Sequence, residues 1–336
     1  MKPPERIAIV YNEPQPSCYD IAGEAQAALE VLGTVGAVRD ALLGLGHNVS
    51  IMPLASLDAL SAILPALDAD LVFNLFEGFC GHPETEALVP EILEDTGIPY
   101  TGCSAPALRL ALNKAAAKRA LMAAGIPTPA FQLLTPETIS EFDLGYPAIV
   151  KPLHEDASHG LSADSVVKDV TGLSRQLHKV CRTYGSAALV EEFIGGRELN
   201  ATVLVNGGST VLPVSEITYD LPGGLPEILT FAAKWQPESP YYRGTQPVCP
   251  AGLPITIYQE ATATARRAFE LLGDGRGYAR VDMRLDATGR CHVLEINPNP
   301  DITPGSGAVL QAATAGMDYP RFLTKIITAA VERNGR

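Results

Sequence analysis

The sequence predicts a protein of the α/β and α+β classes, with a parallel sheet near the N-terminus and strand hairpins after it. Three observations predict this. Apolar strands alternate with helical stretches over residues 7–75, which is typical of a parallel sheet covered by helices. Hairpin patterns occupy residues 198–214 and 277–298. A chain of 336 residues is too long for one simple hydrophobic core, so we expect two or three packed subdomains.

In the first third of the chain we expect strands at 7–10, 48–52 and 70–75, with helices at 29–46 and 57–67 between them. Ligands bind at the carboxyl ends of such strands, so Asn12, Glu13 and residues 76–78 lie on the expected functional rim. For Glu13 ordinary loop polarity is the favoured interpretation, and for Glu77 a functional role is favoured.

The middle of the chain begins with a helical stretch at 84–96 and an extended piece at 98–101. Ser104 predicts the N-cap of one helix that runs through Ala123. Lys114 and Lys118 lie one turn apart on it, and such lysines usually form a solvated face. Strands are expected at 131–134 and 146–152, and Lys151 follows an apolar run, where a solvating lysine is less expected. The polar loop 153–161 has backbone N–H groups that can wrap phosphates, but it lacks a Walker A pattern.

In the last third we expect a strand at 187–194 and a hairpin at 198–214 that turns at 206–207. Residues 221–240 have no regular pattern. Helices are expected at 254–272 and 319–331.

The hairpin 277–298 carries the strongest chemical signal. A register symmetric about the turn 286–289 pairs the residues Arg280 with Asn297, Asp282 with Glu295, and Met283 with Leu294. Because alternate residues share a face, the apolar face then holds Val281, Met283, Leu285, Leu294 and Ile296. Opposed carboxylates repel one another unless a cation or proton lies between them, and their oxygens are ligands that Mg²⁺ prefers. The residues alone leave two interpretations of this face open: a metal site, or a solvated face on which Arg280 neutralises a carboxylate.

Composition narrows the classes of partner. The chain is 46% hydrophobic and 19% charged, as in ordinary globular proteins, and its net charge of −13 opposes nucleic acids and anionic membranes. Its six cysteines show no Cys-x-x-Cys spacing, so we expect reduced thiols and neither a zinc site nor a disulfide framework. Without a signal-type segment or an apolar run of membrane-spanning length, the expected location is cytoplasmic.

These motifs together resemble the ATP-grasp superfamily, and within it the D-alanine–D-alanine ligase group. The similarity covers the chain from about residue 70 to the end, and more loosely the first strand and helix. The motifs that carry it lie at 112–114, 149–152, 190–194, 197–198, 233–234, 249–252, 279–282 and 294–297. Each is weak alone, whereas their order and spacing are specific.

The resemblance implies an ATP-grasp fold with three parts: an N-terminal substrate-side domain (1–102), a central ATP-grasp subdomain (103–190) and a C-terminal one with the metal site (191–336). It implies that ATP is held by Lys114, Lys151, Ser158, Glu191, Phe193, Ile194, Glu198 and Lys234. It also implies two Mg²⁺, with Mn²⁺ as an alternative, at Asp282, Glu295 and Asn297. By the same resemblance, Arg280 faces negative charge at the reacting carbon and Ser306 meets the acceptor's carboxylate.

The implied activity is that of an ATP-dependent carboxylate–amine ligase. ATP converts a carboxylate into an acyl phosphate, and an amino acid or other amine attacks it. Arg280 and backbone donors would stabilise the oxyanion of the tetrahedral intermediate. No enzyme nucleophile is needed, and a homodimer is expected only from the resemblance.

Departures from the family cluster at the amino-acid substrate. The Gly-rich Ser-x-Glu loop after the first strand is replaced by residues 11–15, Tyr-Asn-Glu-Pro-Gln. Ala157-Ser158 stands in place of a Ser-Ser pair, Trp235 in place of a Tyr, and Glu77 in place of a His. Changed hydrogen-bonding groups change which substrate is accepted. We therefore expect substrates other than D-alanine, with Glu77 receiving a substrate ammonium.

Other functions remain possible at this point. The close alternative is a genuine D-alanine–D-alanine ligase of peptidoglycan synthesis with a rewired pocket. An ATP-grasp kinase and a non-catalytic nucleotide-binding regulator are further alternatives, although Arg280 argues against a regulator, which needs no oxyanion partner. A hydride-transfer Rossmann enzyme is disfavoured because the first strand–helix turn lacks the required glycines.

Overall fold

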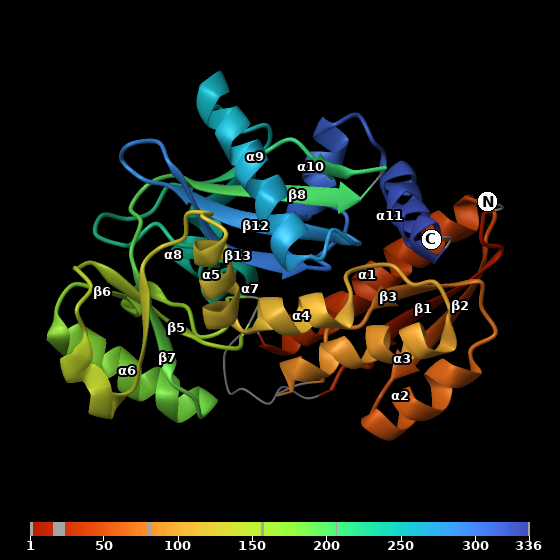
Figure 1. Ribbon diagram of the computed structural model, residues 1–336, viewed down its shortest axis with the longest axis horizontal. Helices are drawn as coiled ribbons and strands as arrows, with labels where there is room; N and C mark the ends of the chain where they lie inside the picture. The colour runs from red at the N-terminus through yellow and green to blue at the C-terminus, as the bar shows by residue number, and fades with distance from the viewer. Residues whose placement is uncertain (1–2, 16–23, 80–81, 156–157, 206, 335–336) are drawn as a thin grey trace.

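The computed structural model describes residues 3–15, 24–79, 82–155, 158–205 and 207–334, which form three sheets with helices around them (Figure 1). The strands are β1 (Arg6–Asn12), β2 (Asn48–Leu54), β3 (Leu71–Leu75), β4 (Phe131–Leu134), β5 (Ala148–Pro152), β6 (Val166–Val167), β7 (Ala188–Glu192), β8 (Glu198–Val205), β9 (Ser209–Val211), β10 (Ser215–Tyr219), β11 (Thr245–Val248), β12 (Tyr278–Leu285) and β13 (Cys291–Pro298). The helices are α1 (Glu24–Gly44), α2 (Leu57–Ile63), α3 (Leu88–Thr96), α4 (Ala105–Leu112), α5 (Lys114–Ala123), α6 (Val170–Tyr184), α7 (Phe231–Trp235), α8 (Pro240–Gly244), α9 (Ile255–Leu272), α10 (Gly307–Thr314) and α11 (Tyr319–Asn334).

The N-terminal sheet has the order β2-β1-β3 and is parallel, which confirms the predicted α/β start of the chain. Alternate residues of β1 enter two different cores. Ile7 and Ile9 pack with α1 and α11, whereas Ala8 and Val10 pack with α2 and α3. Both faces are therefore covered, and the carboxyl ends of the strands remain open for a ligand.

The central sheet has the order β4-β7-β5-β6, and α6 packs on it. Helix α6 was not predicted from the sequence, although its signals are present. Leu173, Leu177 and Val180 share one helical face, the Asp169 carboxylate accepts a hydrogen bond from the Gly172 N–H (2.8 Å), and Gly185 ends the helix at a φ of 64°.

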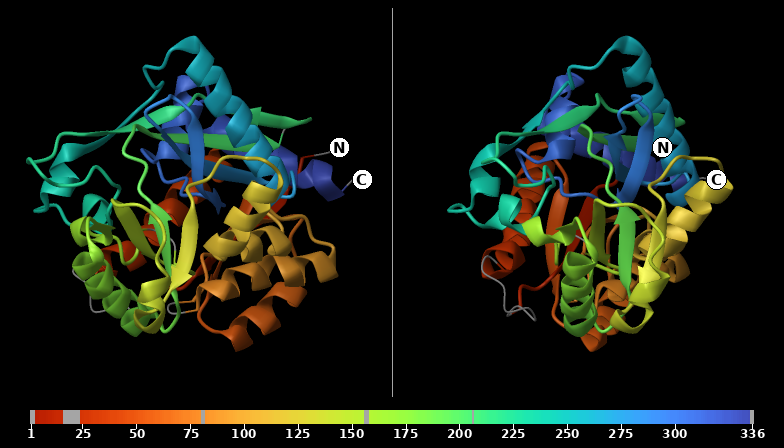
Figure 2. Two further views of the ribbon diagram at one scale, coloured as in Figure 1. Left: turned by 60° about the vertical axis from the view of Figure 1, so that its left-hand side comes forward. Right: turned by 90° about the vertical axis from the view of Figure 1, so that its left-hand side faces the viewer.

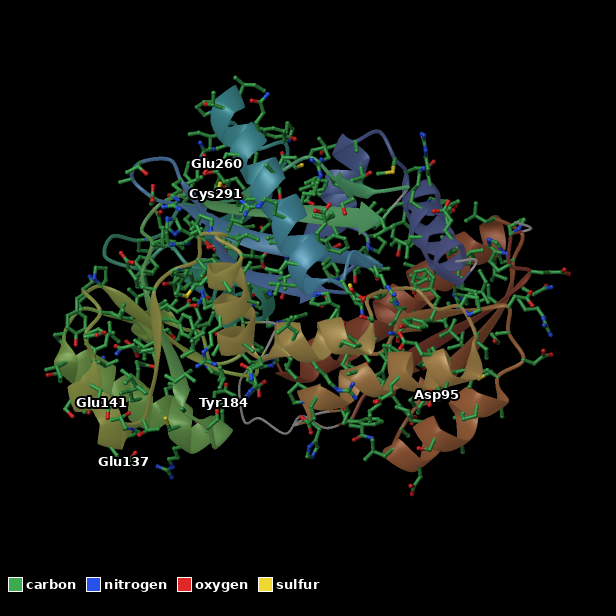
Figure 3. The ribbon with its side chains drawn as sticks, viewed as in Figure 1. Asp95, Glu137, Glu141, Tyr184, Glu260 and Cys291 are labelled. Atoms are coloured by element: carbon green, nitrogen blue, oxygen red, sulfur yellow. The ribbon has the colours of Figure 1, made fainter. Side chains whose placement is uncertain are left out.

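The third sheet has the order β11-β10-β8-β12-β13, with β9 paired to β8, and α9 lies across it (Figure 1). The Cys291 N–H donates to Glu260 Oε1 (3.2 Å), which fastens α9 to the start of β13; the two side chains lie side by side in Figure 3. The C-terminal α11 packs near α1, so both ends of the chain lie on one side of the molecule (Figure 2). Within the described residues, no helix is both long enough and apolar enough to cross a bilayer.

The predicted helix from Ser104 to Ala123 is wrong in one respect, because the chain forms two helices there. Asn113 has φ −85° and ψ 88°, which interrupts the helix, and its side chain accepts a hydrogen bond from the Ala116 N–H (3.0 Å) to cap α5. Ser104 does precede α4, but its side chain makes no capping hydrogen bond.

Several other stretches contain structure that was not predicted. The supposedly irregular residues 221–240 include α7, which carries Lys234 and Trp235. The elements β10, β11, α8 and α10 were also missed. The predicted domain boundaries after residues 102 and 190 stay predictions.

The register of the β12–β13 hairpin was partly predicted. Arg280 pairs with Asn297 and Asp282 with Glu295, as expected, but Met283 pairs with Val293 rather than Leu294. The Asp286 N–H donates to the Arg290 carbonyl (3.0 Å). The loop between the two strands is therefore one residue shorter than the symmetric register requires. A β-bulge at Leu294 restores the predicted pairing beyond it.

Candidate active site

A cavity of about 680 Å³ lies where elements of the three sheets meet. Most of the predicted site residues line it, namely Glu77, Lys114, Lys151, Ser158, Glu191, Phe193, Ile194, Glu198, Lys234, Arg280, Asp282, Glu295 and Asn297. Ser306 is not on the cavity wall; it precedes α10, and its hydroxyl donates to the Asp301 carbonyl (2.9 Å). Ala157 lies outside the described residues. The roles assigned to these side chains stay predictions.

The bulge in β13 determines what faces this cavity. Val293 takes the core position that was predicted for Leu294 and packs with Val281 and Met283. Leu294 instead lines the cavity beside Glu295. The extra residue therefore adds an apolar side chain to the cavity wall and keeps Glu295 on that wall.

The Asp282 carboxylate accepts four hydrogen bonds. Arg280 donates to both of its carboxylate oxygens (2.7 and 2.8 Å), Asn200 donates to Oδ1 (2.6 Å) and Asn297 to Oδ2 (2.8 Å). Burial alone would lower the pKa of Arg280, but the charge of Asp282 outweighs it and raises that pKa. The Arg280 guanidinium is therefore a fixed, permanent cation in the cavity wall.

The oxygens of this hairpin fit a hard divalent cation. Asp282 and Glu295 contribute carboxylates, and because Asn297 donates through Nδ2, its Oδ1 remains for a ligand. Burial would raise the pKa of Glu295, but the charges of Lys114 and other nearby cations outweigh it and lower that pKa. In the described parts of the chain, no group of three or more His, Cys, Asp or Glu side chains could hold a metal ion. Two carboxylates and an amide instead leave positions for phosphate oxygens and water, as Mg²⁺ sites usually do.

Lys118 and Lys151 form a buried ion-pair network with Glu191. Their ammonium groups lie 2.6 and 2.7 Å from the two Glu191 carboxylate oxygens. Burial would raise the pKa of Glu191, yet the two lysines outweigh it and lower that pKa to about 2. Lys118 also donates to Thr128 Oγ1 (2.7 Å), which in turn donates to the Val293 carbonyl (2.7 Å) just before the bulge.

This network corrects one expectation and refines another. The lysines of α5 do not form a solvated face, because Lys114 is 7% and Lys118 1% exposed. The Glu191 carboxylate is engaged by two lysines, so an adenine contact at this residue would come from its backbone. Lys114 lies 3.8 Å from Glu295 and donates to the Glu155 carbonyl, which ties α5 to the loop after β5.

Two partners of Glu198 were not predicted from the sequence: Arg284, which lines the cavity, and Tyr219. Arg284 Nη2 (3.0 Å) and the Tyr219 hydroxyl (2.8 Å) both donate to Glu198 Oε2. Arg284 also donates to the Ile194 carbonyl (2.7 Å) and lies over the Phe193 ring, 5.0 Å from its centre. Alternation from Arg280 and Asp282 could have identified Arg284, and alternation from Glu198 could have identified Asn200.

A second part of the cavity wall, which we call the acidic end, carries carboxylates. Glu30, Glu77 and Asp301 line it, and they form no ion pair with any described residue. Burial raises the pKa of Glu77 to about 7, aided by the negative charges of Asp301 and Glu30. The Glu77 side chain still contacts solvent in the open cavity, and this contact should reduce the shift until a ligand excludes water. Glu30 was missed because it lies within α1 and belongs to no motif.

Comparison with known proteins gives consistent matches. A family model described as the D-ala D-ala ligase C-terminus matches residues 120–328. The uncharacterized protein y4sG of Sinorhizobium fredii is 36% identical over 80% of this chain and 76% of its own length. The D-alanine–D-alanine ligase of Haemophilus influenzae is 32% identical over 91% of this chain and 98% of its own. The Bacillus anthracis D-alanine–D-alanine ligase structure complexed with ATP shares the fold, with a TM-score of 0.73, 22% identity and 98% coverage of both chains.

Proposed function

We propose that this protein joins a carboxylate to an amino acid or related amine, and that its two substrates are not both D-alanine. The chain belongs to the D-alanine–D-alanine ligase family, has the ATP-grasp fold of that family and is an ATP-dependent ligase that forms C–N bonds. One observation carries the proposal. In one cavity, paired cations and metal-type oxygens form one end, and the acidic end holds carboxylates that form no ion pair with any described residue, although the charges of Arg280 and Lys234 act on Asp301. The first end suits a nucleotide triphosphate and the second suits a substrate ammonium.

At the nucleotide end, Lys114, Lys151 and Lys234 contribute positive charge for ATP phosphates. Burial and the nearby Arg280 charge lower the pKa of Lys234, and a bound triphosphate would reverse that shift. Ser158 in the loop after β5 would add a polar contact to the phosphates. Glu198, fixed by Arg284 and Tyr219, would accept hydrogen bonds from the ribose hydroxyls.

Mg²⁺ would be held by Asp282, Glu295 and Asn297. The ion would offset negative charge on the phosphates during phosphoryl transfer. Arg280, Asn200 and Asn297 together donate four hydrogen bonds to the Asp282 carboxylate, so the ion would have to displace at least one of these donors when it binds.

The reaction then has two steps. A carboxylate oxygen of the first substrate attacks the γ-phosphorus of ATP, which releases ADP and leaves an acyl phosphate. The acceptor's amine attacks the carbonyl carbon, and collapse of the tetrahedral intermediate expels phosphate and leaves an amide. Arg280, on the wall of the same cavity, would stabilise the oxyanion of that intermediate.

The acidic end supports a departure from D-alanine as the substrate. Glu77 would hold a substrate ammonium, with Glu30 beside it. The negative charge of Asp301 would oppose the carboxylate of an acceptor that binds near it. The Ser306 hydroxyl, which was expected to meet that carboxylate, already donates a hydrogen bond to the Asp301 carbonyl. These features favour substrates with more positive charge than D-alanine carries at this end.

The test is a matrix of carboxylates and amines supplied with ATP and Mg²⁺, read out as ADP and free phosphate, with mass spectrometry of the products. We expect at least one pair to give equimolar ADP and phosphate and an amide product. ADP without free phosphate, together with a stable phosphorylated product, would instead indicate a kinase and overturn the proposal.

A second candidate is a genuine D-alanine–D-alanine ligase, which the names of the relatives favour. Supplying D-alanine alone with ATP separates the two. Phosphate release at a rate equal to that of the best pair in the matrix would establish this second function and contradict the first.

A further inference from the structure

The second step of the proposed reaction needs a group that accepts a proton. At neutral pH an alkyl amine is an ammonium, and it must lose a proton before its nitrogen can attack a carbonyl carbon. The buried carboxylates of the nucleotide end are already paired with cations. The acidic end is the better source of a base, because Glu30, Glu77 and Asp301 form no ion pair with any described residue.

Asp301 is the acidic-end carboxylate that lies nearest to the nucleotide end. It follows β13 by three residues, and of the three carboxylates it has the strongest charge interaction with Arg280 and with Lys234. Its charge also acts on Glu77 and Glu30. Charge interactions weaken with distance, so Asp301 lies between the two groups. An amine that attacks a carbonyl carbon beside Arg280 would therefore pass close to Asp301.

The Asp301 carboxylate is held through one of its two oxygens. Its Oδ1 accepts hydrogen bonds from the Thr303 N–H (2.7 Å) and from the Thr303 hydroxyl (2.6 Å). Because that hydroxyl donates to Asp301, it accepts in turn from the hydroxyl of Thr34 on α1. Oδ2 accepts no hydrogen bond from any residue that the structure describes. One oxygen therefore fixes the orientation of the group, and the other is available for a proton.

We propose that Asp301 is the general base of the second step and takes a proton from the acceptor's ammonium. The N–H bond breaks, the proton passes to Oδ2, and the electron pair left on nitrogen forms the bond to the carbonyl carbon. When the tetrahedral intermediate collapses, the C–O bond to phosphate breaks and a second proton passes from nitrogen to the departing phosphate. Asp301 is exposed, so it returns its own proton to water. This inference rests on the acyl phosphate route of the proposed function.

The experiment uses Asp301→Asn, which keeps the Oδ1 acceptor for Thr303 and removes the base. Two acceptors are compared: the best amine of the matrix, and hydroxylamine, which is a neutral nucleophile at neutral pH and yields a hydroxamate. With the amine we expect kcat to fall about 100-fold at an unchanged KM. With hydroxylamine we expect a rate within about threefold of the wild type, because that acceptor needs no base.

Asp318→Asn is the matched control. Asp318 is exposed, lies outside the residues that line the cavity and likewise accepts a backbone hydrogen bond, from the Arg321 N–H (2.9 Å). We expect this exchange to change the rate with neither acceptor.

The outcomes separate the two proposals. Equal losses with the amine and with hydroxylamine would show that Asp301 only supports the local structure, which overturns the inference and leaves the ligase proposal intact. A raised KM for the amine at an unchanged kcat would make Asp301 a binding group and would also overturn the inference. A wild-type protein that forms neither amide nor hydroxamate from any carboxylate would overturn the ligase proposal, and this inference with it.

Discussion

The two ends of the cavity differ in how their charges are satisfied. At the nucleotide end, buried carboxylates meet cations in the pairs Lys151–Glu191, Arg280–Asp282 and Arg284–Glu198. At the acidic end, Glu30, Glu77 and Asp301 form no ion pair with any residue that the structure describes. Paired groups are held in position before a ligand binds, whereas unpaired ones require a ligand of opposite charge. The difference suggests that the nucleotide end supplies the general chemistry and the acidic end selects the substrate.

The largest expected effect comes from Glu295. Its carboxylate lies 3.8 Å from Lys114 Nζ, farther from a cation than the three paired carboxylates of the nucleotide end. Glu295→Gln removes one charge and little volume from the expected metal site. We expect kcat to fall on the order of 10³-fold with an unchanged circular dichroism spectrum. Glu270→Gln on the exposed face of α9 is the matched control. A variant that keeps more than a tenth of the activity would show that this end does not depend on the charge of Glu295.

Glu191 tests whether pairing holds the nucleotide end together. Glu191→Gln leaves Lys118 and Lys151 buried without their counter-charge, and we expect a loss of about 3 kcal/mol in the free energy of unfolding by urea. The pKa of Glu191 lies at about 2, below its ordinary value of 4.5, so its pairing stabilises the fold above that value and this contribution is lost as the pH falls towards 2. The variant should lack this acid-sensitive component. An equal loss of stability with pH in both proteins would contradict the assignment.

Arg280 tests fixed geometry as distinct from charge. Arg280→Lys keeps the positive charge but cannot make two parallel hydrogen bonds to Asp282. We expect kcat to fall about 100-fold with little change in the KM for ATP, because the lost group acts on the developing oxyanion. A rise in KM alone would mean that Arg280 acts in ground-state binding.

Glu77 gives the smallest expected effect and examines the acidic end. Burial and the negative charges of Asp301 and Glu30 raise the pKa of Glu77 from an ordinary 4.5 towards about 7, and solvent in the open cavity reduces this shift, so the carboxylate replaces the protonated form as the pH rises between these two values. A substrate ammonium needs the carboxylate, and the KM should therefore fall by up to about tenfold per unit as the pH approaches 7 from below. Glu77→Gln should remove this dependence while the KM for ATP stays constant. A pH profile that the substitution leaves unaltered would refute the role of Glu77.

Sequence patterns predicted the nucleotide end better than the acidic end, for a physical reason. The groups on β12 and β13 follow from strand alternation, so Asp282 and Glu295 could be paired before the structure was known. Glu30, Glu77 and Asp301 come from three distant segments, and only the folded chain brings them to one cavity end. The periodicity of a local stretch does not indicate which residues from distant segments come together in the fold.

The remaining errors also have identifiable causes. The burial of Lys118 depends on Glu191, which lies on a strand 73 positions later, so a helical pattern alone suggests a solvated lysine. The register beyond Asp282 depends on which backbone groups close the turn, and alternation does not specify that. The break at Asn113 was visible only as an ordinary polar residue in a helical run.

The bulge at Leu294 has a further consequence for how this hairpin can change over time. Because the surplus residue lies between Val293 and Glu295, its removal would leave a regular ladder with both neighbours on their present faces. The side chain at position 294 can therefore be removed or exchanged while the Glu295 carboxylate next to it keeps its direction. A substitution at this position would change the surface of the cavity wall and leave Glu295 in place.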